Sequence, residues 1–232
     1  MAYGNSFQRT TPIVLNLIII NALVFFAETV FGGSSILVGG SEESNRVYEL
    51  FALHDYRSIF FKPYQIVTHM FMHGSFFHLA FNMLGLWMFG TMLERVWGPK
   101  RFLIFYLVCG VGAALTQMAS YAYDFSHVNY GDTNSMEYVM AQYSSTVGAS
   151  GAIMGVLAAF GYLFPNTKLF IMPIPVPVKA KWAILGIIAL DVFGGVSKTQ
   201  NDNIAHFAHV GGALIGFLIV LYWNKTNKQT FY

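Results

Sequence analysis

Six long runs of apolar residues constrain this chain more than any other feature of its sequence. Most of these runs are near the ~20 residues that a helix needs to cross a bilayer. Only 10% of the 232 residues are charged, whereas a soluble domain has about 25%. So little charge cannot cover a water-facing surface, and the runs therefore predict membrane spans. We expect six spanning helices at residues 12–31, 76–93, 102–121, 147–164, 181–194 and 204–223.

The predicted architecture is an all-α membrane protein, a six-transmembrane-helix bundle that forms a single domain over residues 1–232. The sequence contains no internal repeat. No small-residue cleavage site follows the first apolar run, so we interpret it as a retained helix and not as a signal peptide. The connection from Gly32 to Ser75 mixes aromatic and polar clusters, and we expect it to lie partly in the membrane interface.

Charged residues divide unevenly between the two sides of this bundle. If the N-terminus is cytoplasmic, the inner segments hold Arg9, Arg95, Lys100, Arg101, Lys168, Lys179, Lys181, Lys225 and Lys228 against the single acid Glu94. The outer segments then hold Arg46, Arg57, Lys62 and Lys198 together with Glu28, Glu42, Glu43, Glu49, Asp55, Asp124, Asp132, Glu137, Asp191 and Asp202. The positive-inside rule therefore predicts that both termini are cytoplasmic.

Several polar side chains share one depth in the predicted spans. Ser150 and His209 follow the outer ends of their helices by a few residues, and His78 and Asn82 lie within about two turns of theirs. At ~1.5 Å per residue these four residues lie roughly 5–11 Å below the outer surface. Gln117 reaches a similar layer from a helix of opposite direction. Polar groups at membrane depth are costly, so this clustering indicates a functional site.

Two stripes of small residues give a reason for the serine and the histidine to meet. One consists of Gly148, Gly151, Gly155 and Ala158, and the other of Ala205, Ala208, Gly212 and Gly216. Small faces allow membrane helices to approach closely. If these stripes are in contact, Ser150 and His209 flank the contact and can come within hydrogen-bond reach.

This set of residues suits acyl transfer. A serine hydroxyl becomes a nucleophile when a neutral histidine takes its proton. His78 and Asn82 are four residues apart, so they share a helix face and can point at one oxyanion, and the backbone N–H of Ser150 lies in the first turn of a helix. No Asp or Glu falls at this depth in residues 76–93, 147–164 or 204–223. We therefore expect a catalytic dyad and not a triad.

Four elements of the sequence resemble the rhomboid family of intramembrane serine proteases, in its bacterial-type six-helix form. Gly148-Ala149-Ser150-Gly151 resembles the family's G-x-S-G motif, and the segment from Ala208 to Gly216 resembles its A-H-x-x-G-x-x-x-G helix. Residues 73–82 resemble its second helix. Glu94, Gly98 and Arg101 match the E-x-x-x-G-x-x-R turn that follows, where we expect Glu94 to satisfy backbone donors.

The resemblance implies an endopeptidase that cleaves transmembrane segments of other membrane proteins. It assigns Ser150 as the nucleophile and His209 as the general base, with His78, Asn82 and Gly148 as oxyanion or auxiliary residues. It implies no metal and no organic cofactor. The expected partners are client transmembrane segments and the lipid bilayer, without nucleic acid. The expected location is a bacterial inner membrane, with the active site open to the outer face.

The chain departs from the family pattern at two places. The family often has Trp-Arg in the first loop, where this chain has Tyr64-Gln65. It also often has an aromatic residue four positions after the serine, against which the base packs, where this chain has Met154.

Two other functions remain open at this point. His69 and His73 are four residues apart, and His206 and His209 are three apart, which are spacings that suit metal ligands on helices. A histidine-ligated membrane metalloenzyme is therefore one alternative. A rhomboid-like protein that binds client helices without cutting them is another, although both Ser150 and His209 are present.

Overall fold

The computed structural model describes residues 11–31, 46–170, 176–197 and 204–226. Six charged residues used to predict the topology lie outside these ranges, namely Arg9, Glu42, Glu43, Lys198, Asp202 and Lys228. Five helices in the described ranges are long and apolar enough to cross a membrane. Four of them are α1 (Pro12–Phe31), α6 (Pro99–Asp124), α9 (Ala180–Ser197) and α10 (His206–Thr226).

The fifth long helix, Phe76–Trp97, is continuous and contains one π-helical stretch. Its parts are α4 (Phe76–Gly85), η4 (Leu86–Gly90) and α5 (Thr91–Trp97). The remaining predicted span is α8 (Ser150–Leu163), which has only 14 residues. Most of α8 is buried, so it lies at the centre of the bundle and not at the lipid face. All six predicted spans are therefore helices, and the weak segment 181–194 extends to 180–197.

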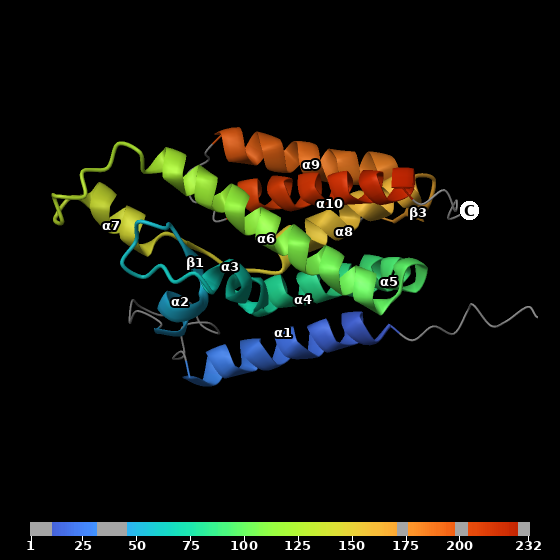
Figure 1. The fold of residues 1–232 in the computed structure, drawn as a ribbon, viewed down its shortest axis with the longest axis horizontal. Coiled ribbons are helices and arrows are strands. Elements are labelled where there is room, and N and C mark those ends of the chain that lie inside the picture. Colours follow the sequence, from blue (N-terminus) through green and yellow to red (C-terminus); the bar gives the residue numbers. More distant parts are fainter. Residues whose placement is uncertain (1–10, 32–45, 171–175, 198–203, 227–232) are drawn as a thin grey trace, which may run out of the picture.

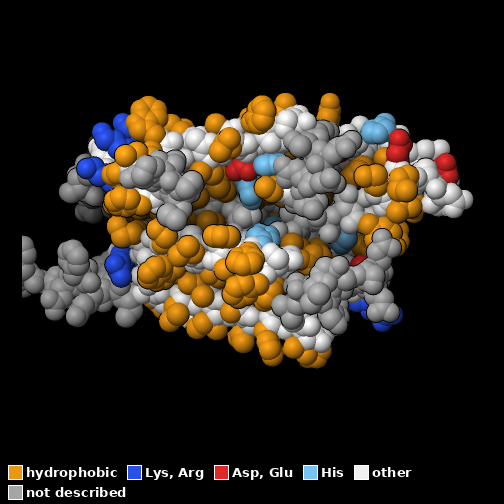
Figure 2. Space-filling view, turned by 180° about the vertical axis from the view of Figure 1, so that it is seen from behind, with side chains coloured by type: hydrophobic (Ala, Val, Ile, Leu, Met, Phe, Trp, Pro, Cys, Tyr) orange, Lys and Arg blue, Asp and Glu red, His pale blue; other side chains and the backbone are white. Residues whose placement is uncertain are grey.

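Figure 1 shows the long helices side by side, with the start of α1 and the end of α10 at the same end of the bundle. The outward faces carry large apolar side chains, such as Phe26, Phe81 and Leu190. Lys and Arg side chains gather at the end that holds the terminus of α10 and Asp and Glu side chains at the other end, where some Lys and Arg also lie (Figure 2). This arrangement matches a multi-pass membrane protein.

Local sequence signals explain where the second and third spans begin. The Ser75 hydroxyl accepts a hydrogen bond from the backbone N–H of His78 and caps α4. Gly98 has a φ of 81°, and Pro99 follows it as the first residue of α6. The Glu94 carboxylate has a longer-range role than expected. It accepts hydrogen bonds from the backbone N–H groups of Ile13 and Val14, so its donors belong to the start of α1 and not to the turn.

Helices α8 and α10 approach so closely that glycine backbones touch. A Cβ added at Gly212 would meet the backbone of Gly151, and one added at Gly216 would lie 2.6 Å from the Cα of Gly155. On its other side, Gly155 faces the Cys109 side chain of α6. The two small-residue stripes of the sequence are therefore in contact, which fixes α8 between α6 and α10.

Short elements cover the end of the bundle that the charge pattern predicts to be the outer one, and we call it the outer end. They comprise α2 (Arg46–Phe51), β1 (Leu53–His54), α3 (Gln65–Thr68), η3 (His69–Phe71), α7 (Met136–Tyr143) and β2 (Ser145–Thr146). Strands β1 and β2 pair in antiparallel fashion. A second small hairpin, β3 (Lys168–Leu169) with β4 (Val178–Lys179), lies between α8 and α9.

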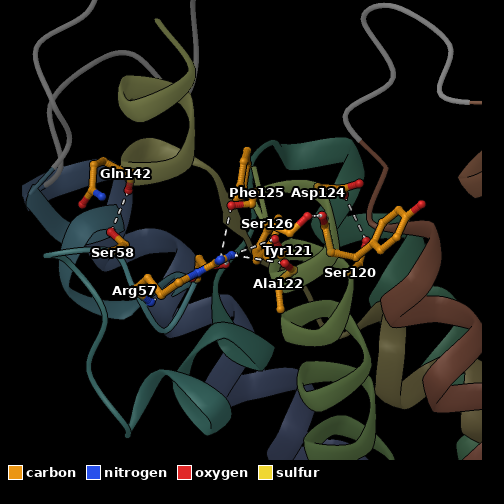
Figure 3. A network of polar contacts seen from close by, with 11 residues as sticks. Arg57, Ser58, Ser120, Tyr121, Ala122, Asp124, Phe125, Ser126 and Gln142 are labelled. Atoms are coloured by element: carbon orange, nitrogen blue, oxygen red, sulfur yellow. Dashed lines mark hydrogen bonds and ion pairs between the residues drawn. The ribbon is translucent and has the colours of Figure 1, made fainter. Parts of the chain in front are cut away.

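Arg57 ties this outer layer to the end of α6 (Figure 3). Its guanidinium donates to the carbonyl oxygens of Tyr121 and Phe125 and pairs with the Asp55 carboxylate at 2.9 Å. A cation is favoured at a helix C-terminus, where carbonyls lack intrahelical partners. The Ser58 hydroxyl in turn donates to the carbonyl oxygen of Gln142 at the end of α7. Residues 55–58 therefore hold the end of α6 and the end of α7 together in one layer.

Candidate active site

Ser150 is the first residue of α8, and a turn that requires glycine at position 148 leads into it. Gly148 has a φ of 128°, a conformation that side chains with a Cβ rarely adopt. Its backbone N–H donates to the carbonyl oxygen of His69 at 2.9 Å, so η3 holds the turn in place. Because Ser150 begins the helix, its own N–H lies among those that have no partner within the helix.

The Ser150 hydroxyl meets the His209 ring. Oγ of Ser150 and Nε2 of His209 are 2.7 Å apart. His209 lies in the first turn of α10, and the glycine contact between α8 and α10 begins directly below it. The structure therefore brings together the two residues that the sequence predicted to be close, and it does so at hydrogen-bond distance.

Asp191 of α9 is a site residue that the sequence reasoning missed. Its Oδ1 lies 2.9 Å from Nδ1 of His209 and 2.8 Å from Nδ1 of His206. Figure 2 shows an acidic side chain against histidine side chains in the middle of the face opposite to that of Figure 1. The expectation of a serine and a histidine without a carboxylate is wrong in this respect. That expectation considered acids only in residues 76–93, 147–164 and 204–223, and it assigned Asp191 to the segments outside the membrane.

The predicted bounds of the fifth span hid Asp191. The span was expected to end at Gly194, only three residues after Asp191, whereas α9 continues to Ser197. At ~1.5 Å per residue Asp191 therefore lies roughly 9 Å below the outer end of the helix. This is the depth range predicted for Ser150 and His209, but only the longer helix of the structure places Asp191 in it.

His78 lies beside the nucleophile turn. A Cβ added at Gly148 would be 2.8 Å from two atoms of the His78 ring and 3.5 Å from Oγ of Ser150. The absence of a side chain at Gly148 therefore leaves room for the His78 ring next to the serine. Asn82 is buried one turn further along α4, and its Nδ2 has no hydrogen-bond partner within the described residues. Both side chains carry N–H groups that can donate hydrogen bonds.

Three other predicted positions are also buried. Gln117 of α6 is buried, and its Oε1 has no hydrogen-bond partner in the part of the chain that the structure describes. Met154 packs with Ala158 and Ala213. Gln65 organises the first loop, since its Nε2 donates to the carbonyl oxygens of Glu49, Leu50 and Phe60. Tyr64, beside it, is exposed.

The two histidine pairs contact different partners. Nδ1 of His69 contacts the carbonyl oxygen of Gln65, whereas His206 and His209 both face Asp191. Over residues 11–31, 46–170, 176–197 and 204–226, no group of three or more His, Cys, Asp or Glu residues is placed to hold a metal ion. The metalloenzyme alternative therefore has no ligand set in these ranges.

The buried histidines just outside the spans are held neutral. Desolvation lowers the pKa of His69 to about 4. Desolvation, with His78 nearby, lowers the pKa of His73 to about 3. The rings of His73 and His78 are 5.0 Å apart. The layer that supports the turn at Gly148 therefore carries no imidazolium charge near neutral pH.

The chain is similar to proteins of one known family over most of its length. The family model described as Rhomboid domain matches residues 61–225. The chain belongs to the rhomboid family. Rhomboid protease AarA of Providencia stuartii is 32% identical over 211 residues, which cover 89% of this chain and 70% of that protein. Rhomboid protease GluP of Bacillus subtilis is 30% identical over 217 residues, which cover 91% of this chain and 35% of that protein.

Mitochondrial proteins are similar as well. Rhomboid protein 1, mitochondrial, of Saccharomyces cerevisiae is 32% identical over 164 residues, which cover 71% of this chain and 43% of that protein. This chain thus spans less than half the length of two of these three relatives. Because the two bacterial relatives that match most of it are named rhomboid proteases, the comparisons support a multi-pass membrane protease.

Proposed function

We propose that this rhomboid-family protein is an intramembrane serine endopeptidase that cleaves transmembrane segments of other membrane proteins. The observation that carries the proposal is the 2.7 Å separation of Oγ of Ser150 and Nε2 of His209 in a bundle of apolar helices. A serine and a histidine in this geometry form a nucleophile with its general base.

The proposed reaction follows from these positions. Nε2 of His209 takes the proton of the Ser150 hydroxyl as Oγ attacks the client carbonyl. The oxyanion that forms is stabilised by the Ser150 backbone N–H, the His78 ring and Nδ2 of Asn82, which has no partner among the described residues. His209 then gives its proton to the leaving amine, and water hydrolyses the acyl-enzyme with His209 again as the base. Every proton transfer uses the same ring nitrogen.

The client must expose a peptide bond at this site. A transmembrane helix satisfies its backbone hydrogen bonds internally, so the bond to be cut has to unwind first. We therefore propose that clients carry helix-weakening residues near the cut and small side chains beside it. The chemistry proposed uses no metal ion and no organic cofactor.

Labelling with a fluorophosphonate probe in detergent or lipid tests the proposal. Wild type should label and cleave a model transmembrane substrate, and Ser150→Ala and His209→Ala should lose both by about 10³-fold or more. Ser120→Ala, a serine at the outer part of α6, is the matched control and should behave as wild type. Equal labelling of Ser150→Ala would refute the nucleophile. Intact labelling without cleavage of any transmembrane substrate would favour a client-binding protein, and activity that depends on an added metal would favour the metalloenzyme.

We also propose that both termini lie in the cytoplasm of a bacterial cell, with the site open to the outer face of the inner membrane, and that residues 1–232 form one domain. Cys109 is buried and is the only cysteine of the sequence, so a maleimide should label only cysteines that are newly introduced. A membrane-impermeant maleimide added from outside should label Asn129→Cys and spare Lys179→Cys. Labelling of Lys179→Cys from outside would contradict the orientation.

A further inference from the structure

Asp191 is a carboxylate at membrane depth whose surroundings specify a role. It is only 8% exposed, on a helix with a mostly apolar and lipid-facing surface. Its Oδ1 contacts two imidazole nitrogens, Nδ1 of His206 and Nδ1 of His209, at 2.8 and 2.9 Å. A charged group at this depth is costly and usually pairs with polar groups that have a function. The costs are offset here by two ring N–H donors.

The contact determines which nitrogen of His209 carries the proton. A carboxylate oxygen can only accept a hydrogen bond, so Nδ1 of His209 must be the donor. In a neutral ring the proton on Nδ1 leaves a lone pair on Nε2. That lone pair faces the Ser150 hydroxyl at 2.7 Å, so the serine donates to it. The contact therefore selects the one tautomer in which His209 can act as a base toward Ser150.

His206 holds the same oxygen from the first residue of α10. It lies three residues before His209, so both rings project from one side of the helix toward α9. On α9, Gly194 provides the space for this ring, since a Cβ there would be 2.5 Å from two atoms of His206. The carboxylate is therefore fixed by its own helix, by His206 and by the lack of a side chain at Gly194.

We propose that Asp191 is a positioning residue that fixes the tautomer and orientation of the His209 base and stabilises the imidazolium that forms during the reaction. This inference rests on the proposed function of Ser150 and His209 and adds a third member to their pair. The titratable groups around the His209 ring are Asp191 from α9, Ser150 from α8, His206 from α10 and His78 from α4. Asp191 is the one acid that the described residues place beside this ring.

Cleavage kinetics of Asp191→Asn on the full chain test the inference. The variant should lower kcat by about 10²-fold with little change in KM, because client binding does not involve the carboxylate. The acid limb of the kcat/KM profile should move to lower pH, since His209 loses the negative charge that favours its protonated form. A residue that only supports folding would change stability without moving this limb. Asp124→Asn, at the outer end of α6, is the matched control and should keep the wild-type kcat and pH profile.

Asp191→Glu supplies a second measurement. It keeps the charge but places it one methylene further out, so it should recover the wild-type acid limb and only part of kcat. If Asp191→Asn does not fold, Asp191→Glu alone decides, and a kcat equal to wild type would overturn the inference. If Ser150→Ala is inactive while Asp191→Asn has the kcat and acid limb of wild type, the inference is wrong and the proposed function stands. Cleavage by Ser150→Ala would instead remove the proposed function itself.

Discussion

Helix α10 packs against α8 and α9 in two different ways. Against α8 the centre of the contact is made by Gly151, Gly155, Gly212 and Gly216, where glycine backbones touch with no room for a side chain between them. Against α9 the outer contact is made by Gly194, His206 and the shared oxygen of Asp191, while most of α9 faces outward. The proposed nucleophile and base thus come from the close-packed pair α8 and α10, whereas the carboxylate comes from α9, the helix with the smaller contact.

The α8–α10 contact sets the distance between Ser150 and His209, whereas the α9–α10 contact orients the His209 ring. Distances between reacting atoms tolerate little change, and a backbone contact without flexible side chains keeps them constant. Orientation of a ring by a hydrogen bond needs only one fixed oxygen. We therefore expect disturbances of the α8–α10 contact to remove both folding and activity, and disturbances of the α9–α10 contact to reduce activity more than stability.

The largest effect should follow from a side chain at the α8–α10 contact. Gly212→Leu would force its Cβ into the backbone of Gly151, where neither helix can yield without separating. We expect loss of the folded, monodisperse protein and of all cleavage, measured by size-exclusion chromatography and a transmembrane-substrate assay. Gly186→Leu is the control, because a Cβ at Gly186 of α9 has no atom within 4 Å. A folded and active Gly212→Leu would show that the contact is not needed.

A smaller effect should follow from Gly148→Ala at the turn before Ser150. Its Cβ adds a clash with the His78 ring at 2.8 Å to the cost of a φ of 128°. We expect about 10²-fold slower cleavage, together with a stability loss on the order of 1–2 kcal/mol. Gly98→Ala separates the two causes, since Gly98 also has a positive φ but nothing within 4 Å of an added Cβ. It should lose stability and retain cleavage, and equal losses of cleavage would argue against the oxyanion role of His78.

Gly194→Val tests the α9 side of the comparison. The added side chain would press on the His206 ring and displace the carboxylate of Asp191 from His209. We expect roughly 10-fold slower cleavage, with a change in unfolding free energy below about 1 kcal/mol because the helix can shift toward lipid. Gly186→Val is the control on the same helix. A large loss of stability with unchanged kcat would contradict the expectation that the α9–α10 contact affects activity more than stability.

The smallest effect should come from acid, through the outer layer. His69 is neutral when folded, with a pKa lowered to about 4, and protonates more readily once unfolded. The folded state therefore binds fewer protons, so its stability is full above the unfolded pKa near 6.5 and is lost as the pH falls toward 4. Between pH 7.5 and 5.5 this amounts to about 1 kcal/mol from His69. Unfolding in mixed detergent should show it. His69→Gln should reduce the dependence by about this amount, while His73, whose pKa is also lowered, retains part of it, and His127→Gln, in an exposed loop, should leave it unchanged.

Much of the site could be predicted because a bilayer ties the position of a residue in a spanning helix to its depth. A helix rises about 1.5 Å per residue, so position in a span converts to depth, and polar residues at depth are few. This is how Ser150, His209, His78 and Asn82 could be grouped before any coordinates. The glycine stripes likewise indicated which helices touch. Their catalytic roles remain predictions.

Depth alone could not tell which side chains face one another. Asp191 shares the layer, but only the packing of α9 on α10 turns it toward His209. Glu94 is four residues from the turn glycine Gly98, yet its donors lie some 80 residues away at the start of α1. Gln65 shows the same limit, since a buried glutamine that binds three carbonyl oxygens has no local signature.

The sequence by itself determined the six apolar helices of the bundle, their order, the layer of the site and the pair of helices that carries Ser150 and His209. These properties depend on hydrophobic length, charge and residue size, which are local. Only the tertiary structure decided that Asp191 and His206 complete the surroundings of the base, that Gly148 leaves room for the His78 ring, and that Glu94 holds α1. Those contacts depend on the rotation of each helix about its axis, which is set by packing against several neighbours at once.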